Sequence, residues 1–126
     1  MAIKAIVCSI AVLMSASLAA ENRFYNILAI DGGGIRGIIP GVVLRHLEED
    51  AYKIAEKRGW LGKIPKYPGQ DKKMALKDIF HMFAGTSTGS ILAAGLSYKH
   101  ETELDKPKFW AQDLLDIYAK QGETIF

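Results

Sequence analysis

Twice along this chain, a short apolar run stops at glycines and a helical pattern follows. The first run, from Phe24 to Ile30, stops at Asp31 and three glycines, and the second, from His81 to Ala84, stops at Gly85. Short apolar runs bounded by turn residues are typical of buried strands. Strand, helix, strand and helix in this order predict an α/β layered fold in which neighbouring strands are parallel.

The helices are predicted from apolar residues at spacings of three or four. The longest follows the first glycine run and ends at Gly59, and Pro40 fits only in its first turn, where a missing N–H leaves no hydrogen bond unmade. The recurring apolar residues of this helix are Ile39, Val43, Leu47, Ala51 and Ile54, and its charged residues, mostly on other faces, are Arg45, Glu48, Glu49, Lys53 and Glu56.

Shorter segments complete the pattern. Residues 59–73, rich in glycine and lysine, predict a surface loop, and residues 75–80 predict a helical turn. Another helix follows Gly89, a polar loop spans 98–106, and Pro107 opens a last helix. The inner face of the last helix is expected to carry Phe109, Leu114, Ile117 and Tyr118.

The composition fits one small domain. The chain has 126 residues, of which 49% are hydrophobic and 24% charged, so a disordered or collagen-like chain is excluded. A net charge of +2 is not the footprint of a nucleic-acid-binding protein. The single cysteine, Cys8, excludes an internal disulfide framework, and the 3 histidines lack the H-x-x-x-H spacing of a zinc site. We therefore expect no metal, cofactor or nucleic-acid partner.

Residues 1–19 have the pattern of a secretory signal peptide. Lys4 gives a positive start, residues 5–16 are mostly apolar, and Ser17-Leu18-Ala19 provides small residues for cleavage. We expect cleavage after Ala19 and secretion of the remaining part, residues 20–126. The alternative is an uncleaved membrane anchor, which the short apolar run disfavours because a spanning helix needs about 20 apolar residues.

The segment Gly85-Thr86-Ser87-Thr88-Gly89 fits G-x-S-x-G, the pattern of a nucleophile elbow. Such an elbow places a serine on a strained strand-to-helix turn and exposes its Oγ, and its glycines are needed because side chains there would collide with the neighbouring strand and helix. The positive N-terminus of the following helix favours anionic intermediates. The simpler alternative is a helix cap rich in serine and threonine. Because the motif lies between a strand pattern and a helix pattern, we expect Ser87 to be a nucleophile.

The segment Asp31-Gly32-Gly33-Gly34-Ile35-Arg36-Gly37 follows the first strand directly. Its glycines free several backbone N–H groups to point one way, which suits an oxyanion or a phosphate. It also contains the G-x-G-x-x-G of dinucleotide-binding loops, which need an acidic residue about 20 positions later at the end of a second strand. Glu49 and Asp50 lie inside the helix pattern instead, and no Walker lysine follows, so nucleotide binding is disfavoured.

Together, DGGGIRG and GTSTG resemble the oxyanion loop and the nucleophile elbow of the patatin-like phospholipase family of lipid acyl hydrolases. The residues IIP after the first motif and Ile125-Phe126 after the last helix are similar to plant patatins as well. The resemblance covers about Phe24 to Phe126. It implies a three-layer α/β/α fold, of which this chain is the N-terminal portion, and a Ser–Asp dyad without histidine. The implied substrates are fatty-acyl esters of membrane lipids, met at the membrane surface.

By matching positions, the resemblance makes Ser87 the nucleophile, with the amides of Gly33 and Gly34 lining the oxyanion hole. Arg36 would hold the loop or a substrate phosphate. The whole implied site consists of Ser87, the elbow residues Gly85, Thr86, Thr88 and Gly89, and the oxyanion-loop residues Gly32, Gly33, Gly34, Arg36 and Gly37.

One part of the family pattern is missing. The family's catalytic aspartate lies in an Asp-Gly-Gly or Asp-Gly-Ala motif far downstream of the elbow, whereas the only Asp followed by Gly here is Asp31. We therefore expect residues 20–126 to be a patatin-like domain truncated before its catalytic aspartate. The alternative function is a non-catalytic fragment that binds lipid or a partner without turnover. The histidines are not favoured as replacement bases for Ser87; they are His46, His81 and His100.

The lysine-rich loop is expected to be a solvated surface. Its lysines are Lys63, Lys66, Lys72 and Lys73. A weak contact with anionic lipid is the alternative.

Overall fold

The structure is a computed structural model that describes residues 25–103 and 105–125. The expected signal peptide, residues 1–19, lies outside the described residues, as does the alternative membrane anchor. Among the helices that are described, none combines the length and the hydropathy needed to cross a membrane.

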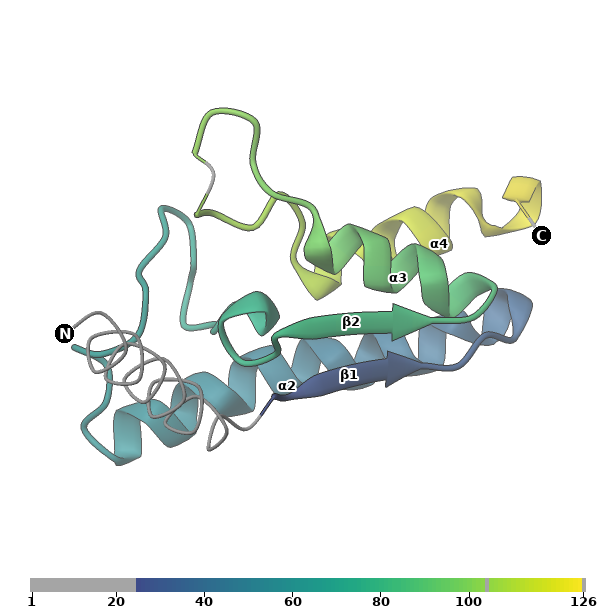
Figure 1. The fold of residues 1–126 in the computed structure, drawn as a ribbon. Helices are drawn as coiled ribbons and strands as arrows, with labels where there is room; N and C mark the ends of the chain where they lie inside the picture. Colours follow the sequence, from purple (N-terminus) through teal and green to yellow (C-terminus); the bar gives the residue numbers. More distant parts are fainter. Residues whose placement is uncertain (1–24, 104, 126) are drawn as a thin grey trace, which may run out of the picture.

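Within the described residues, two parallel strands form the sheet. Strand β1 (Ile27–Ile30) pairs with β2 (Met82–Gly85), with Ile27 opposite Met82 and Ile30 opposite Gly85. The other elements are the 3-10 turns η1 (Gly34–Gly37) and η2 (Leu76–Asp78) and the helices α2 (Ile38–Lys57), α3 (Thr88–Ser97) and α4 (Ala111–Ile125). Figure 1 shows both strands pointing the same way, with α2 running alongside and α3 and α4 beyond β2. The predicted α/β fold with neighbouring parallel strands is confirmed.

The helices pack against one face of the sheet. Ile30 belongs to the buried core, and Leu28 and Phe83 pack against it, whereas Ile27 and Met82 are exposed. Side chains alternate between the two faces of a strand, so these residues separate an inner from an outer face. Among the described residues the outer face carries no helix. The described part therefore supplies two of the three layers that the resemblance implies.

Helix α2 turns a different face to the core from the one that its apolar spacing predicts. Leu44 and Glu48 are buried, whereas Ile39, Val43 and Ile54 are exposed. Leu47, from the predicted stripe, does pack against the core. The prediction is wrong for the three exposed residues because the packing partner of α2 is α4, which meets the other side of the helix.

The burial of Glu48 has a specific cause. Its Oε1 accepts the backbone N–H of Ala111, 3.0 Å away, at the start of α4. An N–H at a helix start has no partner within the helix, so a carboxylate is favoured there. The sequence places Glu48 among charged residues of a solvated face, and no local pattern indicates this distant partner.

Helix α4 begins four residues later than predicted, at Ala111 rather than Pro107. Pro107 instead forms an antiparallel bridge with Lys99, and the Asp113 carboxylate accepts the N–H of Trp110 at 2.8 Å, which fixes the helix start. On the inner face, Leu114 and Tyr118 are buried as predicted; Leu115 joins them, and Ile117 is exposed.

Candidate active site

Both glycine motifs lie at the same end of the sheet. Ile30 and Gly85 are the last residues of their strands and lie opposite one another, and the N–H of Thr86 donates to the Ile30 carbonyl at 3.2 Å. The loop after β1 and the turn after β2 therefore begin side by side (Figure 1). The carboxyl ends of parallel strands are where α/β proteins place their ligands.

Ser87 occupies the strained position of a nucleophile elbow. Its φ is 51° and its ψ is −124°, a backbone conformation that non-glycine residues rarely adopt. Strain of this kind costs about 1–3 kcal/mol and clusters at functional sites. The residue is exposed, and although it precedes α3, its side chain makes no capping hydrogen bond. The structure therefore does not use Ser87 as a helix cap, which was the simpler alternative.

The elbow glycines are required by close backbone contacts. A Cβ added at Gly85 would collide with the Gly89 backbone in α3, and one added at Gly89 would collide with the Ile30 carbonyl in β1. This is the collision with neighbouring strand and helix that the motif predicts. The turn is therefore packed tightly between β1 and α3, and Ser87 lies on its exposed side.

The glycine loop, residues 31–37, which is expected to form the oxyanion hole, lies directly against this turn. A Cβ at Gly32 would meet the Thr86 carbonyl and lie 2.7 Å from the Ser87 Cβ. Gly33 has a φ of 156° and Gly34 a φ of 61°, so both adopt conformations that favour glycine. At Gly34 a Cβ would meet no neighbour, so only its backbone conformation requires glycine.

Two threonines of the elbow hold two amides of the loop. The N–H of Gly32 donates to Thr86 Oγ1 at 3.1 Å, and the N–H of Gly33 donates to Thr88 Oγ1 at 3.1 Å. The Gly33 amide, expected to line the oxyanion hole, is thus paired with a threonine in this structure, whereas the Gly34 amide has no threonine partner. Sequence reasoning missed these bonds. The signal for them was a hydroxyl residue on each side of Ser87.

Arg36 closes the loop but its guanidinium pairs with no carboxylate among the described residues. Its backbone N–H donates to the Gly33 carbonyl at 3.2 Å, and the residue is exposed. It lines a mainly apolar groove of about 420 Å³ between β1 and the start of α2, together with Ile39 and Val43. The expectation that Arg36 holds the loop or a substrate phosphate stays a prediction.

No base for Ser87 is in place within the described part of the chain. Neither a carboxylate nor an imidazole there forms a hydrogen bond with its Oγ, and no cluster of metal-ligating side chains is found in that part either. The histidines have other neighbours: His46 lies 3.7 Å from Glu49, His81 Nδ1 accepts the Asn26 N–H, and His100 Nδ1 lies 3.1 Å from Thr102 Oγ1.

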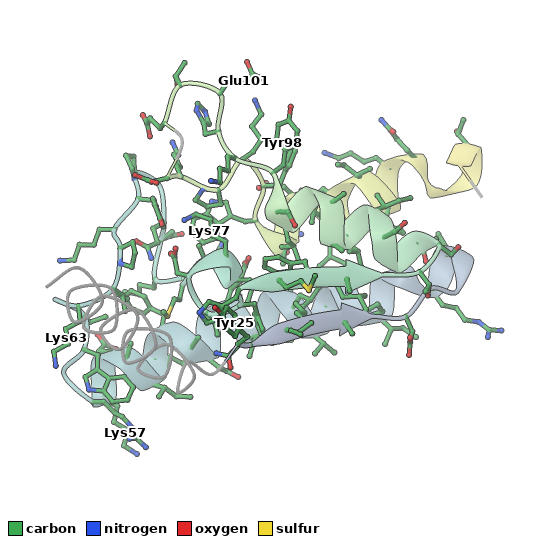
Figure 2. All side chains as sticks on the ribbon, viewed as in Figure 1. Tyr25, Lys57, Lys63, Lys77, Tyr98 and Glu101 are labelled. Carbon is green, nitrogen blue, oxygen red and sulfur yellow. The ribbon has the colours of Figure 1, made fainter. Side chains whose placement is uncertain are left out.

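The lysine-rich loop lies at the opposite end of α2 from Ser87. Figure 2 shows Lys57 and Lys63 near the last turns of α2, away from the end at which the strands finish. A helix of 20 residues is about 30 Å long. A hollow of about 710 Å³ at this end is lined by Lys66 and Lys72, among others, and includes neither glycine motif. An anionic-lipid contact here stays a prediction, and it would not bring Ser87 to the same surface.

Comparison with known proteins identifies the family. The model of the patatin-like phospholipase family matches residues 28–121. Patatin-like protein 2 of rice (Oryza sativa subsp. indica) is 35% identical over 112 residues, covering 89% of this chain and 24% of the rice protein. Patatin-like protein 2 of Arabidopsis thaliana is 37% identical over 105 residues, covering 83% of this chain and 22% of the Arabidopsis protein. Patatin-03 of Solanum tuberosum is 33% identical over 112 residues, covering 89% of this chain and 25% of the potato protein.

The chain spans about a quarter of the length of these curated relatives. No solved structure matches it significantly. The matched residues include most of β1, both glycine motifs and most of α4. Because the family model spans most of the chain and both motifs, the chain belongs to the patatin-like phospholipase family.

Proposed function

We propose that this chain carries the nucleophile and the oxyanion loop of a serine lipid acyl hydrolase, of the phospholipase A or esterase type. The observation that supports this most is the state of Ser87. It is exposed, held in a strained conformation, free of a capping role, and placed beside a glycine loop at the N-terminus of α3. A serine that served only as a helix cap would accept a hydrogen bond from a backbone N–H in the first turn of the helix that follows it.

In the proposed reaction, Ser87 Oγ attacks the carbonyl carbon of a fatty-acyl ester. The new Oγ–C bond forms as the carbonyl oxygen takes up negative charge, and the Gly34 N–H and the N-terminus of α3 stabilise that charge. The ester C–O bond then breaks and the alcohol leaves. Water hydrolyses the acyl-enzyme and releases the fatty acid.

The proton of Ser87 must pass to a base, which gives it to the leaving alkoxide and later takes a proton from the attacking water. The family resemblance assigns this role to an aspartate in a downstream Asp-Gly-Gly or Asp-Gly-Ala motif. The proposed chemistry requires no metal or cofactor. Membrane lipids as substrates, a peripheral contact with the membrane surface and secretion through residues 1–19 are part of the same proposal; they are supported by the family and the sequence pattern.

The second candidate function is a non-catalytic fragment that binds lipid or a partner. The observation that favours it is the lack of any base bonded to Ser87 within the described residues. The hydrolase and the non-catalytic fragment are distinguished by whether a base is supplied to take the proton of Ser87.

A chimera distinguishes the two functions. Residues 25–121 of this chain replace the matching segment of the rice relative, and hydrolysis of phospholipid vesicles is measured for the chimera and two variants. Ser87→Ala removes the proposed nucleophile. Ser97→Ala is the matched control, because Ser97 lies at the far end of α3 and its hydroxyl donates to the Ala93 carbonyl within the helix.

The proposal requires hydrolysis and labelling by a fluorophosphonate in the chimera and in Ser97→Ala, and neither in Ser87→Ala. Equal labelling of Ser87→Ala would show that another residue is the nucleophile. A folded chimera that neither hydrolyses lipid nor reacts with the label would support the non-catalytic candidate instead.

A further inference from the structure

Thr88 connects three separate parts of the fold. Its side chain is buried, at 2% exposure. Its Oγ1 accepts the N–H of Gly33 from the oxyanion loop at 3.1 Å, and its backbone carbonyl accepts the hydroxyl of Tyr118 from α4 at 2.8 Å. Buried polar groups are costly unless paired, so these bonds fix the position of Thr88 firmly. The residue directly follows Ser87 in the chain.

Thr86 makes the corresponding bond on the other side of Ser87. Its Oγ1 accepts the N–H of Gly32 at 3.1 Å. Two adjacent amides of the loop are therefore held by the two residues that flank the nucleophile. A Cβ added at Gly32 would also lie only 2.7 Å from the Ser87 Cβ, so the loop packs directly against the elbow, apart from these hydrogen bonds.

The loop needs such anchors because its three glycines allow the backbone many conformations. Glycine populates positive and negative φ about equally, so a run of three glycines does not by itself fix where its N–H groups point. The Gly34 amide follows directly after the two anchored amides. A threonine is suited to anchoring, since its β-branched side chain has few rotamers and its oxygen stays in place.

We infer that Thr88 and Thr86 are positioning residues, which hold the glycine loop at a fixed distance from Ser87 so that the Gly34 amide faces the reacting carbonyl. The inference rests on the proposed function for its catalytic consequence. Neither threonine touches the reacting atoms; both act through the loop. Tyr118 holds Thr88 in turn, and so links the loop to the packing of α4.

The first test is independent of catalysis and uses the full chain. Amide hydrogen exchange is measured by NMR at Gly32 and Gly33 in the wild type and in Thr88→Val, which keeps the side-chain shape and removes the acceptor. We expect exchange at Gly33 to rise at least about tenfold in Thr88→Val, with Gly32 unchanged. Thr86→Val should show the reverse, and Thr88→Ser and Thr86→Ser should restore protection.

The crossed pattern separates anchoring from general destabilisation, which would raise exchange at both glycines together. Unchanged exchange at Gly33 in Thr88→Val, or equal increases at both glycines, overturns the inference. If Thr88→Val does not fold, the exposed Thr86 provides the test: loss of protection at Gly32 in Thr86→Val, restored in Thr86→Ser, upholds the anchoring, and no loss refutes it.

The second test uses the chimera described above. Thr88→Val should lower kcat about tenfold or more with KM nearly unchanged, because a displaced oxyanion donor acts in the transition state, and Thr88→Ser should restore kcat. A normal kcat in a variant that has lost Gly33 protection would overturn the positioning role. An inactive wild-type chimera would instead count against the proposed function, and the exchange test would still decide whether the threonines anchor the loop.

Discussion

At the scale of single residues, two members of the candidate site have an unusual backbone conformation. Ser87 and Gly34 both have positive φ, one in the turn after β2 and the other in the loop after β1. Both can be identified from sequence, because G-x-S-x-G and the glycine run are patterns in which local conformation is built into the residue type. Glu48 cannot, because its burial depends on the distant N–H of Ala111.

Replacing Gly34 by alanine should lower turnover in the chimera. No atom lies within 4 Å of the added Cβ, so the change acts only by straining a φ of 61° and turning the neighbouring amide. Loss of one oxyanion donor typically costs about 10²–10³ in kcat, or about 2.7–4 kcal/mol. Steady-state kinetics measures the effect, and circular dichroism checks that the fold is kept. An unchanged kcat would exclude the loop from the mechanism.

Glu48 should make the stability of the chain depend on pH. Burial raises the pKa of Glu48 from 4.5 to about 7; the Ala111 N–H and Lys73 oppose this rise, and Asp113 and Glu49 add to it. Because the folded pKa is the higher one, the stability that this group contributes is full below about pH 4.5 and is lost as the pH rises through about 7.

Compared with Glu48→Gln, the wild type should therefore lose about 3 kcal/mol of unfolding free energy between pH 4.5 and pH 8. Urea unfolding across this range measures the difference between the two proteins, which removes the contribution of all other carboxylates. Parallel pH profiles would show that Glu48 is not buried in solution.

At the scale of elements, the strands and α3 agree with the sequence better than the helix faces do. Short apolar runs ended by glycine have few alternative structures, so the sequence places β1, β2 and α3 within a few residues. Helix α2 has two stripes with helical spacing, one through Val43 and one through Leu44, and only contact with α4 decides between them. Such a choice depends on tertiary packing and cannot be made from periodicity alone.

The start of α4 should depend on Asp113. Its carboxylate accepts the N–H of Trp110, the residue just before the helix, so Asp113→Ala leaves that N–H without this partner. We expect a loss of about 1 kcal/mol in unfolding free energy. Gln121→Ala, an exposed change in the same helix, is the control and should stay within about 0.5 kcal/mol of the wild type. Equal effects of the two changes would mean that the cap contributes nothing.

At the scale of the whole molecule, the described residues leave large apolar side chains exposed in two places. Ile39 is 65% and Val43 60% exposed beside the groove along β1, and Ile27 and Met82 are each 57% exposed on the outer face of the sheet. Large apolar patches promote association. The three-layer fold that the family resemblance implies has a second helix layer on such a face, and the described residues do not contain one.

The chain alone should therefore associate reversibly, so that its sedimentation coefficient rises with concentration. The double variant Ile39→Lys, Val43→Glu removes apolar surface from the groove without touching the buried core, and should shift sedimentation toward the monomer. Lys57→Gln, at the last turn of the same helix, should not. A wild-type chain that sediments as a monomer would contradict the prediction.

Residues 20–126 alone should hydrolyse no lipid ester above background. A serine hydroxyl without a base is a poor nucleophile, and loss of a base commonly costs several orders of magnitude in rate. Release of fatty acid from phospholipid vesicles is the measurement. Activity that disappears in Ser87→Ala would show that a base within this chain completes the site.

Strands β1 and β2 end opposite one another, at the paired residues Ile30 and Gly85, and this has a consequence for comparing family members. The two motifs meet because both strands finish together, not because a fixed number of residues separates them in the chain. The turns from Arg58 to Lys73 lie at the other end of the sheet, so insertions there leave the motifs aligned. A single extra residue inside either strand, by contrast, would reverse which side chains face the helices and displace one motif from the other. A sequence search that required a constant spacing between the motifs would therefore reject any relative with an insertion in these turns, whereas one that held the strand lengths constant would keep it.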